Sequence, residues 1–294
     1  MFSTVLFPTD FSRHADKILE CIPDLQRYGM KEAVFVHVIN PMKAAQWISV
    51  DEQIIEKAER EARKSIDDVV THVMSLHGIM ARQRIEIGVI YQEIVRVAYE
   101  EQASLIIMGS HGHGFVRTAL LGSVAQNVLR TTGIPLIIEK FTYQASDESA
   151  SLEFVSDTMF SRILFPTDFS ENSLAVLKVL REMNSVGIET IYVAHIQDAD
   201  RFQYFSTEKR QEFDQIDSER LSRLKQKIEF WGYTTKTILR DGYPAQEINR
   251  IAEDENVSMI IMGSHGRSVV KDALVGSVAE SVALRHVRPL MIIP

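Results

Sequence analysis

Residues 105–125 of the chain are Leu105-Ile-Ile-Met-Gly-Ser-His-Gly-His-Gly-Phe-Val-Arg-Thr-Ala-Leu-Leu-Gly-Ser-Val-Ala125. The pattern returns as Met259-Ile-Ile-Met-Gly-Ser-His-Gly-Arg-Ser-Val-Val-Lys-Asp-Ala-Leu-Val-Gly-Ser-Val-Ala279. Each copy is a short apolar run followed by Gly-x-x-Gly, nine residues, and Gly-Ser. The apolar run predicts a buried parallel strand, and the apolar spacing after Gly-Ser predicts a helix.

The glycines between this strand and this helix suit the binding of a phosphate group. Glycine lets the backbone approach an anion and turn its N–H groups toward it, and the start of a helix adds a partial positive charge. One glycine-rich loop would be a weak indication. The same spacing twice in one chain is a strong one.

The chain is duplicated outside these loops as well. Thr4-Val-Leu-Phe-Pro-Thr-Asp-Phe-Ser12 returns as Arg162-Ile-Leu-Phe-Pro-Thr-Asp-Phe-Ser170, so that Asp10 and Asp168 are 158 positions apart. His37 and His195 have the same separation. We therefore predict two copies of one domain.

The length and composition agree with two globular domains. A chain of 294 residues, 45% of them apolar and 24% charged, can form two domains of about 150 residues, each with its own core. We expect the first domain at residues 1–143 and the second at residues 159–294. The polar segment 144–158 is expected to be a linker.

In each copy, apolar strands alternate with helical segments. The expected strands are Val5–Phe7, Ala33–Ile39, Arg84–Gly88, Leu105–Met108 and Ile134–Lys140, then Ile163–Phe165, Thr190–Ile196, Thr235–Leu239, Met259–Met262 and Leu290–Ile293. Long helices are expected at Asp51–Leu76 and Tyr91–Glu101, and Pro23 should kink or restart the first helix. This order predicts an α/β fold class, with two tandem doubly wound five-stranded parallel sheets covered on both faces.

The motif Gly-x-x-Gly-x9-Gly-Ser after an Ile-Met strand resembles the nucleotide-binding signature of the universal stress protein family. The resemblance extends over nearly the whole chain, as in a tandem, two-domain member of the ATP-binding type. It implies a Rossmann-like, adenine nucleotide alpha hydrolase-like fold with strand order 3-2-1-4-5. It also implies ATP or AMP as ligand and a role in stress response or signalling.

Ligands of doubly wound sheets bind beyond the carboxyl ends of the strands, where the winding direction reverses. Together with the resemblance, this places the first nucleotide site at Thr9, Asp10, Val38, Gly109, Gly112, His113, Gly122, Ser123 and Val124. The second site is placed at Thr167, Asp168, Ile196, Gly263, Gly266, Arg267, Gly276, Ser277 and Val278. In the family, the aspartate lies near the ribose or the phosphates, and the residue matching Val38 or Ile196 contacts adenine through its backbone.

Simpler roles stay open for several of these residues. Asp10 and Asp168 stand where helix-capping residues are common, and capping can coexist with ligand binding. Val38 and Ile196 fit a buried core equally well. The His-x-His at His113 lacks an accompanying acidic or cysteine cluster, so we expect no metal site built from protein ligands, although Mg²⁺ could accompany bound phosphates.

The two copies differ at one loop. Gly242-Tyr-Pro matches the family's Gly-x-Pro at the start of the third helix, whereas the first copy has Ile90 in the proline position. Proline fixes φ at a helix start. We therefore expect a looser loop and a weaker site in the first copy.

Charge and cysteine content exclude other classes of protein. The net charge is −8 without a basic block, which argues against nucleic acid as a partner. The single cysteine, Cys21, suits a reducing cytoplasm, and we expect neither a signal peptide nor a membrane span. The expected partner is an adenine nucleotide, with the two halves paired as an intramolecular pseudo-dimer and a further homodimer as an option.

Catalysis is the second hypothesis. The sequence contains no P-loop, no Gly-x-Gly-x-x-Gly fingerprint and no hydrolase-type nucleophile motif, so we assign no catalytic residue. We favour a nucleotide-binding module over an enzyme. The alternatives are a slow ATPase or phosphotransferase and a nucleotide-free interaction scaffold.

Overall fold

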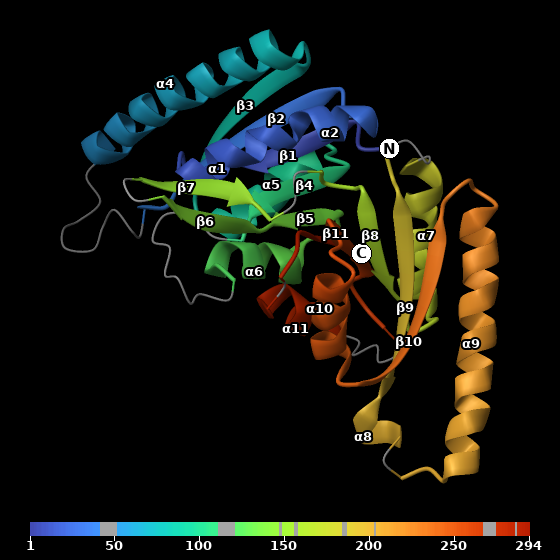
Figure 1. The fold of residues 1–294 in the computed structure, drawn as a ribbon. Helices are drawn as coiled ribbons and strands as arrows, with labels where there is room; N and C mark the ends of the chain where they lie inside the picture. Colours follow the sequence, from blue (N-terminus) through green and yellow to red (C-terminus); the bar gives the residue numbers. More distant parts are fainter. Residues whose placement is uncertain are drawn as a thin grey trace. The chain divides into compact units, whose positions relative to one another are not determined.

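The computed structural model describes residues 1–41, 52–110, 121–146, 149–155, 158–183, 187–202, 204–266, 275–285 and 287–294. The chain divides into two compact units, Met1–Glu153 and Phe154–Pro294 (Figure 1). The division falls inside the segment 144–158 that the sequence indicates as a linker.

In the first unit, strands and helices alternate along the chain. Its elements are β1 (Thr4–Pro8), α1 (Arg13–Ile18), η1 (Leu19–Cys21), α2 (Ile22–Arg27), β2 (Glu32–Ile39), α4 (Glu52–His77), β3 (Met80–Ile87), α5 (Ile90–Glu100), β4 (Leu105–Gly109), α6 (Ser123–Thr131), β5 (Leu136–Glu139), β6 (Phe141–Ser146) and β7 (Ser149–Phe154). Strands β1 to β5 are parallel and lie in the order β3-β2-β1-β4-β5. Strands β6 and β7 form a separate two-stranded sheet.

The second unit repeats this arrangement. Its elements are β8 (Arg162–Pro166), α7 (Glu171–Met183), β9 (Thr190–Asp198), α8 (Ala199–Phe202), α9 (Thr207–Glu229), β10 (Thr235–Gly242), α10 (Pro244–Asp254), β11 (Met259–Gly263), α11 (Ser277–Arg285) and β12 (Leu290–Ile293). The parallel strands lie in the order β10-β9-β8-β11-β12. Both units therefore confirm the predicted doubly wound, five-stranded fold with order 3-2-1-4-5.

The central strands are buried on both faces, as their continuous apolar runs predict. Val5, Leu6 and Phe7 of β1 are at most 2% exposed, although their side chains point alternately to opposite faces of the sheet. The long helices α4 and α9 pack on the outer strands, α4 on β2 and β3 and α9 on β9 and β10 (Figure 1). The core of each unit thus lies between its sheet and the helices on either side.

The first helical segment is interrupted as the proline predicts. Helix α1 passes through the 3-10 turn η1 into α2, where Pro23 stands in the first turn. Proline lacks a backbone N–H and is tolerated at this position, because the N–H there has no partner within the helix. Pro23 therefore starts a new helix.

Several segments differ in extent from the sequence prediction: β10 continues from the expected Leu239 to Gly242, and β5 covers only Leu136–Glu139 of the expected Ile134–Lys140. Strand β3 begins at Met80, four residues before the expected Arg84, and exposed and partly buried residues alternate from Met80 to Gln83. The expected linker contains β7 and the end of β6. Both segments alternate apolar and polar residues, which is a strand pattern, but the sequence prediction relied on their low content of large apolar residues.

The expected loosening at Ile90 is not seen in the backbone. The N-cap Val89 before α5 has φ −77° and ψ 117°, and the N-cap Tyr243 before α10 has φ −83° and ψ 116°. Both helices contain 11 residues. The surrounding fold therefore sets this turn without the proline, and the effect on affinity stays a prediction.

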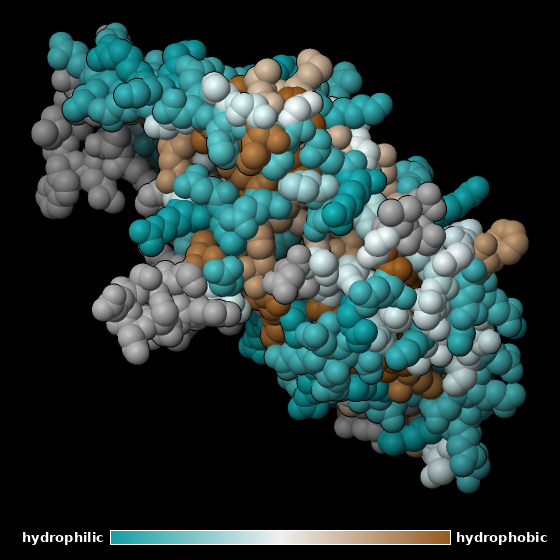
Figure 2. All heavy atoms as spheres, turned by 45° about the horizontal axis from the view of Figure 1, so that its top comes forward, coloured by the Kyte–Doolittle hydropathy of each residue, from teal (hydrophilic) through white to brown (hydrophobic). Residues whose placement is uncertain are grey.

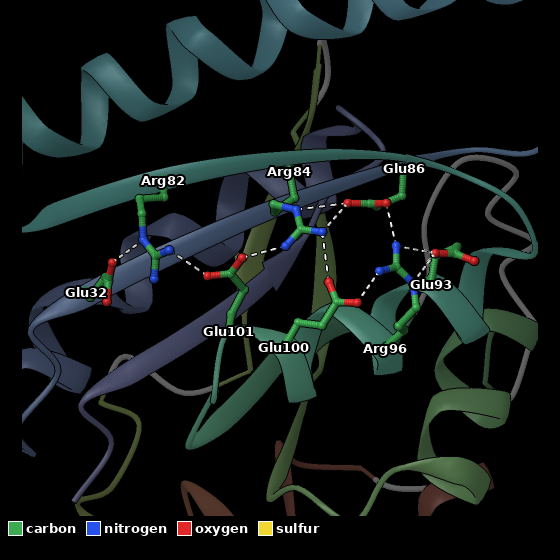
Figure 3. A network of polar contacts seen from close by, with 8 residues as sticks. All are labelled: Glu32, Arg82, Arg84, Glu86, Glu93, Arg96, Glu100 and Glu101. Atoms are coloured by element: carbon green, nitrogen blue, oxygen red, sulfur yellow. Dashed lines mark hydrogen bonds and ion pairs between the residues drawn. The ribbon is translucent and has the colours of Figure 1, made fainter.

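A network of ion pairs fastens the outer strand β3 to α5 (Figure 3). Arg82, Arg84 and Glu86 alternate along β3 and point to one face, as side chains two apart in a strand must. Arg84 contacts Glu100 and Glu101 at 2.9 and 2.6 Å. The complete network consists of Glu32, Arg82, Arg84, Glu86, Glu93, Arg96, Glu100 and Glu101. Charged side chains of this kind also keep an outer strand from pairing with other chains.

One face of the molecule shows how polar and apolar residues are distributed on the surface. Hydrophilic residues cover most of the face visible in Figure 2, and hydrophobic ones reach it in separate small areas. Among the described helices, none combines the length and apolar composition needed to cross a membrane.

Candidate functional site

The chain turns sharply at the carboxyl end of β1, where the sequence places Thr9 and Asp10. The Thr9 N–H donates to the carbonyl of Val36 at 2.9 Å, which holds the turn against β2. Asp10 Oδ1 accepts the N–H of Ser12 at 3.1 Å, and Ser12 Oγ accepts the N–H of Ala15 at 3.3 Å. Ser12 is therefore the N-cap of α1, and Asp10 forms the turn that precedes it.

The second unit builds the same turn with one more contact. Asp168 Oδ1 accepts the N–H of Ser170 at 3.0 Å and its hydroxyl at 2.6 Å. Ser170 Oγ in turn accepts the N–H of Ser173 at 3.2 Å. The capping role weighed for this aspartate thus belongs to the serine two residues later.

A histidine from the neighbouring strand fastens each turn. His37 Nδ1 lies 2.8 Å from the carbonyl of Thr9, and His195 Nδ1 lies 2.7 Å from that of Thr167. Because a carbonyl can only accept, each Nδ1 must carry the proton. The sequence interpretation used these histidines as repeat markers and gave them no role in the turn, although their equal spacing could have suggested one.

A phenylalanine packs on each histidine from within the turn. Phe11 stacks on His37 with ring centroids 4.5 Å apart, and Phe169 lies 4.6 Å from His195. Both phenylalanines have positive φ angles, 58° and 62°, which few residues other than glycine adopt. Backbone strain of this kind persists where surrounding contacts hold the conformation.

The glycine loops return to the sheet at the expected positions. The Gly122 N–H donates to the carbonyl of Ser110 at 2.8 Å, and the Gly276 N–H donates to that of Ser264 at 2.7 Å. Helices α6 and α11 start at the next residue. The predicted residues Gly112, His113 and Arg267 lie outside the described residues.

The ends of the first and fourth strands meet in the second unit. A Cβ built on Gly266 would lie 2.5 Å from Asp168 Oδ2, so no side chain fits there without displacing the carboxylate. A Cβ on Gly276 would lie 3.6 Å from the backbone nitrogen of Gly266. The structure thus gathers Asp168, Gly266 and Gly276, as the topological argument predicts.

Gly263 has a packing role. A Cβ at this position would lie 2.7 Å from the carbonyl oxygen of Asn172 in α7. The helix can approach the end of β11 because Gly263 has no side chain. Gly109 stands at the corresponding end of β4.

The remaining predicted residues divide into buried and exposed ones. Val38 and Ile196, near the ends of β2 and β9, are each 9% exposed. Ser123 and Ser277 are exposed at the starts of α6 and α11, Val278 is 38% exposed, and Val124 is partly buried. The helix starts that follow the glycine loops are therefore accessible, whereas the strand ends are buried.

Two electrostatic features bear on the chemistry of these sites. Burial and, second, the negative charge of Asp10 raise the pKa of Asp16, one helical turn into α1.

Among the described residues, no group of three or more His, Cys, Asp or Glu could hold a metal ion. A cation beside Asp10 or Asp168 would therefore need ligands from a bound molecule.

Fold and site define the class of protein. Each unit is a doubly wound α/β domain, with an aspartate-bearing turn and a glycine loop on either side of the point where the winding direction reverses. The model of the universal stress protein family matches residues 1–140 and 159–294. The chain belongs to the universal stress protein family, in tandem form.

Individual relatives agree with this assignment. A universal stress protein of Methanocaldococcus jannaschii is 31% identical over 154 residues, which are 46% of this chain and 95% of the relative. The crystal structure of a universal stress protein from Archaeoglobus fulgidus is 27% identical, with a TM-score of 0.72, and the match covers 98% of this chain and 95% of that one. A functionally unknown protein from Pseudomonas aeruginosa shares the fold at 13% identity, with a TM-score of 0.61 over 99% of this chain and 92% of its own.

Proposed function

We propose that each unit binds one adenine nucleotide, ATP or AMP, and that the chain acts as a stress-response or signalling module. The observation that carries the proposal is the meeting of Asp168, Gly266 and Gly276 beside the start of α11. The Gly276 N–H itself donates to the Ser264 carbonyl, so the donors for a phosphate are the first N–H groups of α11 that follow it, together with the partial positive charge of the helix start. The matching residues of the first unit follow the same sequence pattern.

The residues of each site have separate roles in this proposal. The glycine loops, with Ser123 and Ser277, bind the phosphates. The strand ends at Val38 and Ile196 contact the adenine through their backbones.

The aspartates would contact the ribose, or a Mg²⁺ ion whose remaining ligands are phosphate oxygens. Asp168 suits either role, because its carboxylate lies beside the fourth-strand loop, with Oδ2 next to Gly266. Such an ion belongs with the nucleotide, since Mg²⁺ is usually bound through one or two carboxylates together with substrate phosphates.

The decisive experiment identifies the bound ligand. The purified chain is denatured, and the released small molecules are identified by mass spectrometry. The nucleotide-free protein is then melted with ATP, ADP and AMP. A ligand at 100 times its Kd stabilises the unit that binds it by about 2.7 kcal/mol. No released nucleotide and an unmoved melting curve at millimolar ligand would overturn the proposal and leave the interaction scaffold. Release of phosphate from ATP would favour the slow ATPase.

The proposal has a second part. It assigns residues 1–143 and 159–294 to two domains and expects these two halves to pair with each other. Each half ends in an apolar strand, Leu136–Glu139 or Leu290–Ile293, and such a strand tends to pair when its edge is unprotected. The linker raises the effective concentration of one half near the other. We expect residues 1–145 alone to form homodimers, or to aggregate, in sedimentation experiments. A soluble monomer at high concentration would contradict the pairing.

A further inference from the structure

A buried polar cluster lies beside the aspartate turn of the second unit. Asp217 of α9 is 5% exposed, and its carboxylate receives contacts from three side chains. The Gln197 amide donates to Oδ2 at 3.2 Å, and Arg220 Nη1 lies 3.2 Å from Oδ1. His195 Nε2 lies 3.5 Å from Oδ2. Burying a carboxylate is unfavourable unless such partners compensate it.

Two polar neighbours of His195 bear on its charge. Nδ1 faces the carbonyl of Thr167 at 2.7 Å and must carry a proton, because the carbonyl only accepts. If Nε2 carried none, its lone pair would face the negative oxygen of Asp217. When both ring nitrogens are protonated, one N–H donates to the carbonyl and the other points to the carboxylate. The geometry therefore favours the imidazolium form of His195.

The first unit lacks the carboxylate. Its long helix buries Ala62, Ile66 and Val73, and α9 buries Asp217, Leu221 and Ile228, each 155 positions later. Ala62 therefore takes the place of Asp217. Gln197 is likewise replaced by the apolar Ile39, the residue 158 positions earlier. His37 keeps its bond to the Thr9 carbonyl but has no corresponding acid at this helix position.

The cluster is in direct contact with the aspartate turn. Arg220, which pairs with Asp217, also lies over the Phe169 ring at 5.4 Å from its centroid. Phe169 packs against His195 in its positive-φ conformation. Charge and packing thus connect α9 to the residues that flank Asp168.

We propose that Asp217 holds His195 as an imidazolium and thereby positions the Thr167–Ser170 turn, so that nucleotide binding depends on pH in the second site and not in the first. The nucleotide part of this inference rests on the proposed function. Asp217 is a positioning residue, because it acts on the site through His195 and Phe169.

The direction of the pH effect follows from the charges that face His195. The Asp217 carboxylate, 3.5 Å from Nε2, favours the charged ring, and the Arg220 guanidinium of the same helix pairs with the other oxygen of that carboxylate. When the ring loses its Nε2 proton at higher pH, it loses its attraction to Asp217. The turn is then held less firmly, and affinity at the second site falls.

The test uses the full chain with ¹⁵N-labelled histidine. NMR of the wild type at pH 7.5 should show His195 protonated at both nitrogens, whereas an ordinary histidine, with a pKa near 6.5, is mostly neutral. In Asp217→Asn the ring should become neutral, and the amide signals of Phe169 and Ser170 should shift while those of Phe11 and Ser12 stay in place. Asp214→Asn removes an exposed carboxylate from the same helix and should change none of these signals.

Calorimetric titration with ATP then follows each site as a function of pH. We expect Asp217→Asn to weaken the second site about tenfold at pH 7.5, the loss of one charge-assisted contact, and to remove its pH dependence. A neutral His195 in the wild type overturns the inference, as does a ring unaffected by Asp217→Asn. A second site with pH-independent affinity overturns the positioning role. Absence of nucleotide binding at both sites would refute the proposed function, while the histidine and amide signals would still decide this inference.

Discussion

Gly266 lies directly against Asp168: a Cβ on the glycine would stand 2.5 Å from the carboxylate oxygen Oδ2. The two residues are 98 positions apart in the chain and follow two different strands, β8 and β11. Their contact locates the point in the second unit where the winding direction of the sheet reverses. Asp168 can keep its position only if residue 266 has no side chain.

Gly266→Ala should therefore weaken the second nucleotide site by about tenfold or more, because the new methyl group must displace the Asp168 carboxylate. Calorimetric titration should then show one strong site where the wild type shows two. Asp214→Ala, which changes an exposed residue of α9 in the same unit, is the control and should leave both sites at full strength. A Gly266→Ala chain that keeps two full-strength sites would contradict this explanation.

Gly122→Val and Gly276→Val should each abolish binding at their own site and leave the other intact. Both glycines precede a helix and donate to a serine carbonyl through their N–H groups. A branched side chain there blocks the approach of a phosphate to the backbone. Titration of each single variant should show one site lost, and two full-strength sites in both would refute the assignment of the phosphate position.

Glu139→Gln should stabilise the first unit at neutral and alkaline pH. Burial raises the pKa of Glu139 from 4.5 to about 8, and the charge of Asp24 adds to the shift. Between these values the folded chain holds a proton that the unfolded chain has released, so stability falls as pH rises through this window. Urea unfolding at pH 5 and pH 9 should show that fall in the wild type. The variant should be more stable by roughly 2–4 kcal/mol at pH 9.

The control for Glu139→Gln is Asp68→Asn, which removes an exposed carboxylate from the same unit. It should leave the difference between the two pH values unchanged. A wild type that is equally stable at pH 5 and pH 9 would show that Glu139 is ionised in the folded protein.

Arg84→Ala should destabilise the first unit by about 1 kcal/mol in urea unfolding, since three carboxylates lose their shared partner. Arg84 contacts Glu86, Glu100 and Glu101 at 2.6–2.9 Å, and its side chain is 29% exposed. High salt should reduce the difference. Arg60→Ala, which removes a 3.6 Å pair between two side chains that are more than half exposed, should have almost no effect. A salt-independent loss at Arg84 would point to packing of its aliphatic stem.

Local patterns in the sequence were sufficient for much of the fold. Apolar runs such as Leu105–Met108 predict buried parallel strands, because both faces of such a strand must be covered, and β4 has this burial. The duplication gave two domains, and the resemblance gave the strand order that both sheets confirm. The pair β6 and β7 was missed, because the segment was judged by its polar composition, although both strands alternate apolar and polar residues.

The sequence alone determined which residues gather at the ends of the first and fourth strands, because parallel topology brings those ends together whatever the side chains are. The tertiary structure decided which side chains touch there. Asp217 can contact His195 only because α9 packs over β9 in one particular position along its axis. The sequence does not give that position, because the helices of the two units correspond at a spacing of 155 residues and the histidines at 158. Spacing in one chain cannot reveal that position, because packing of buried side chains between helix and strand sets it.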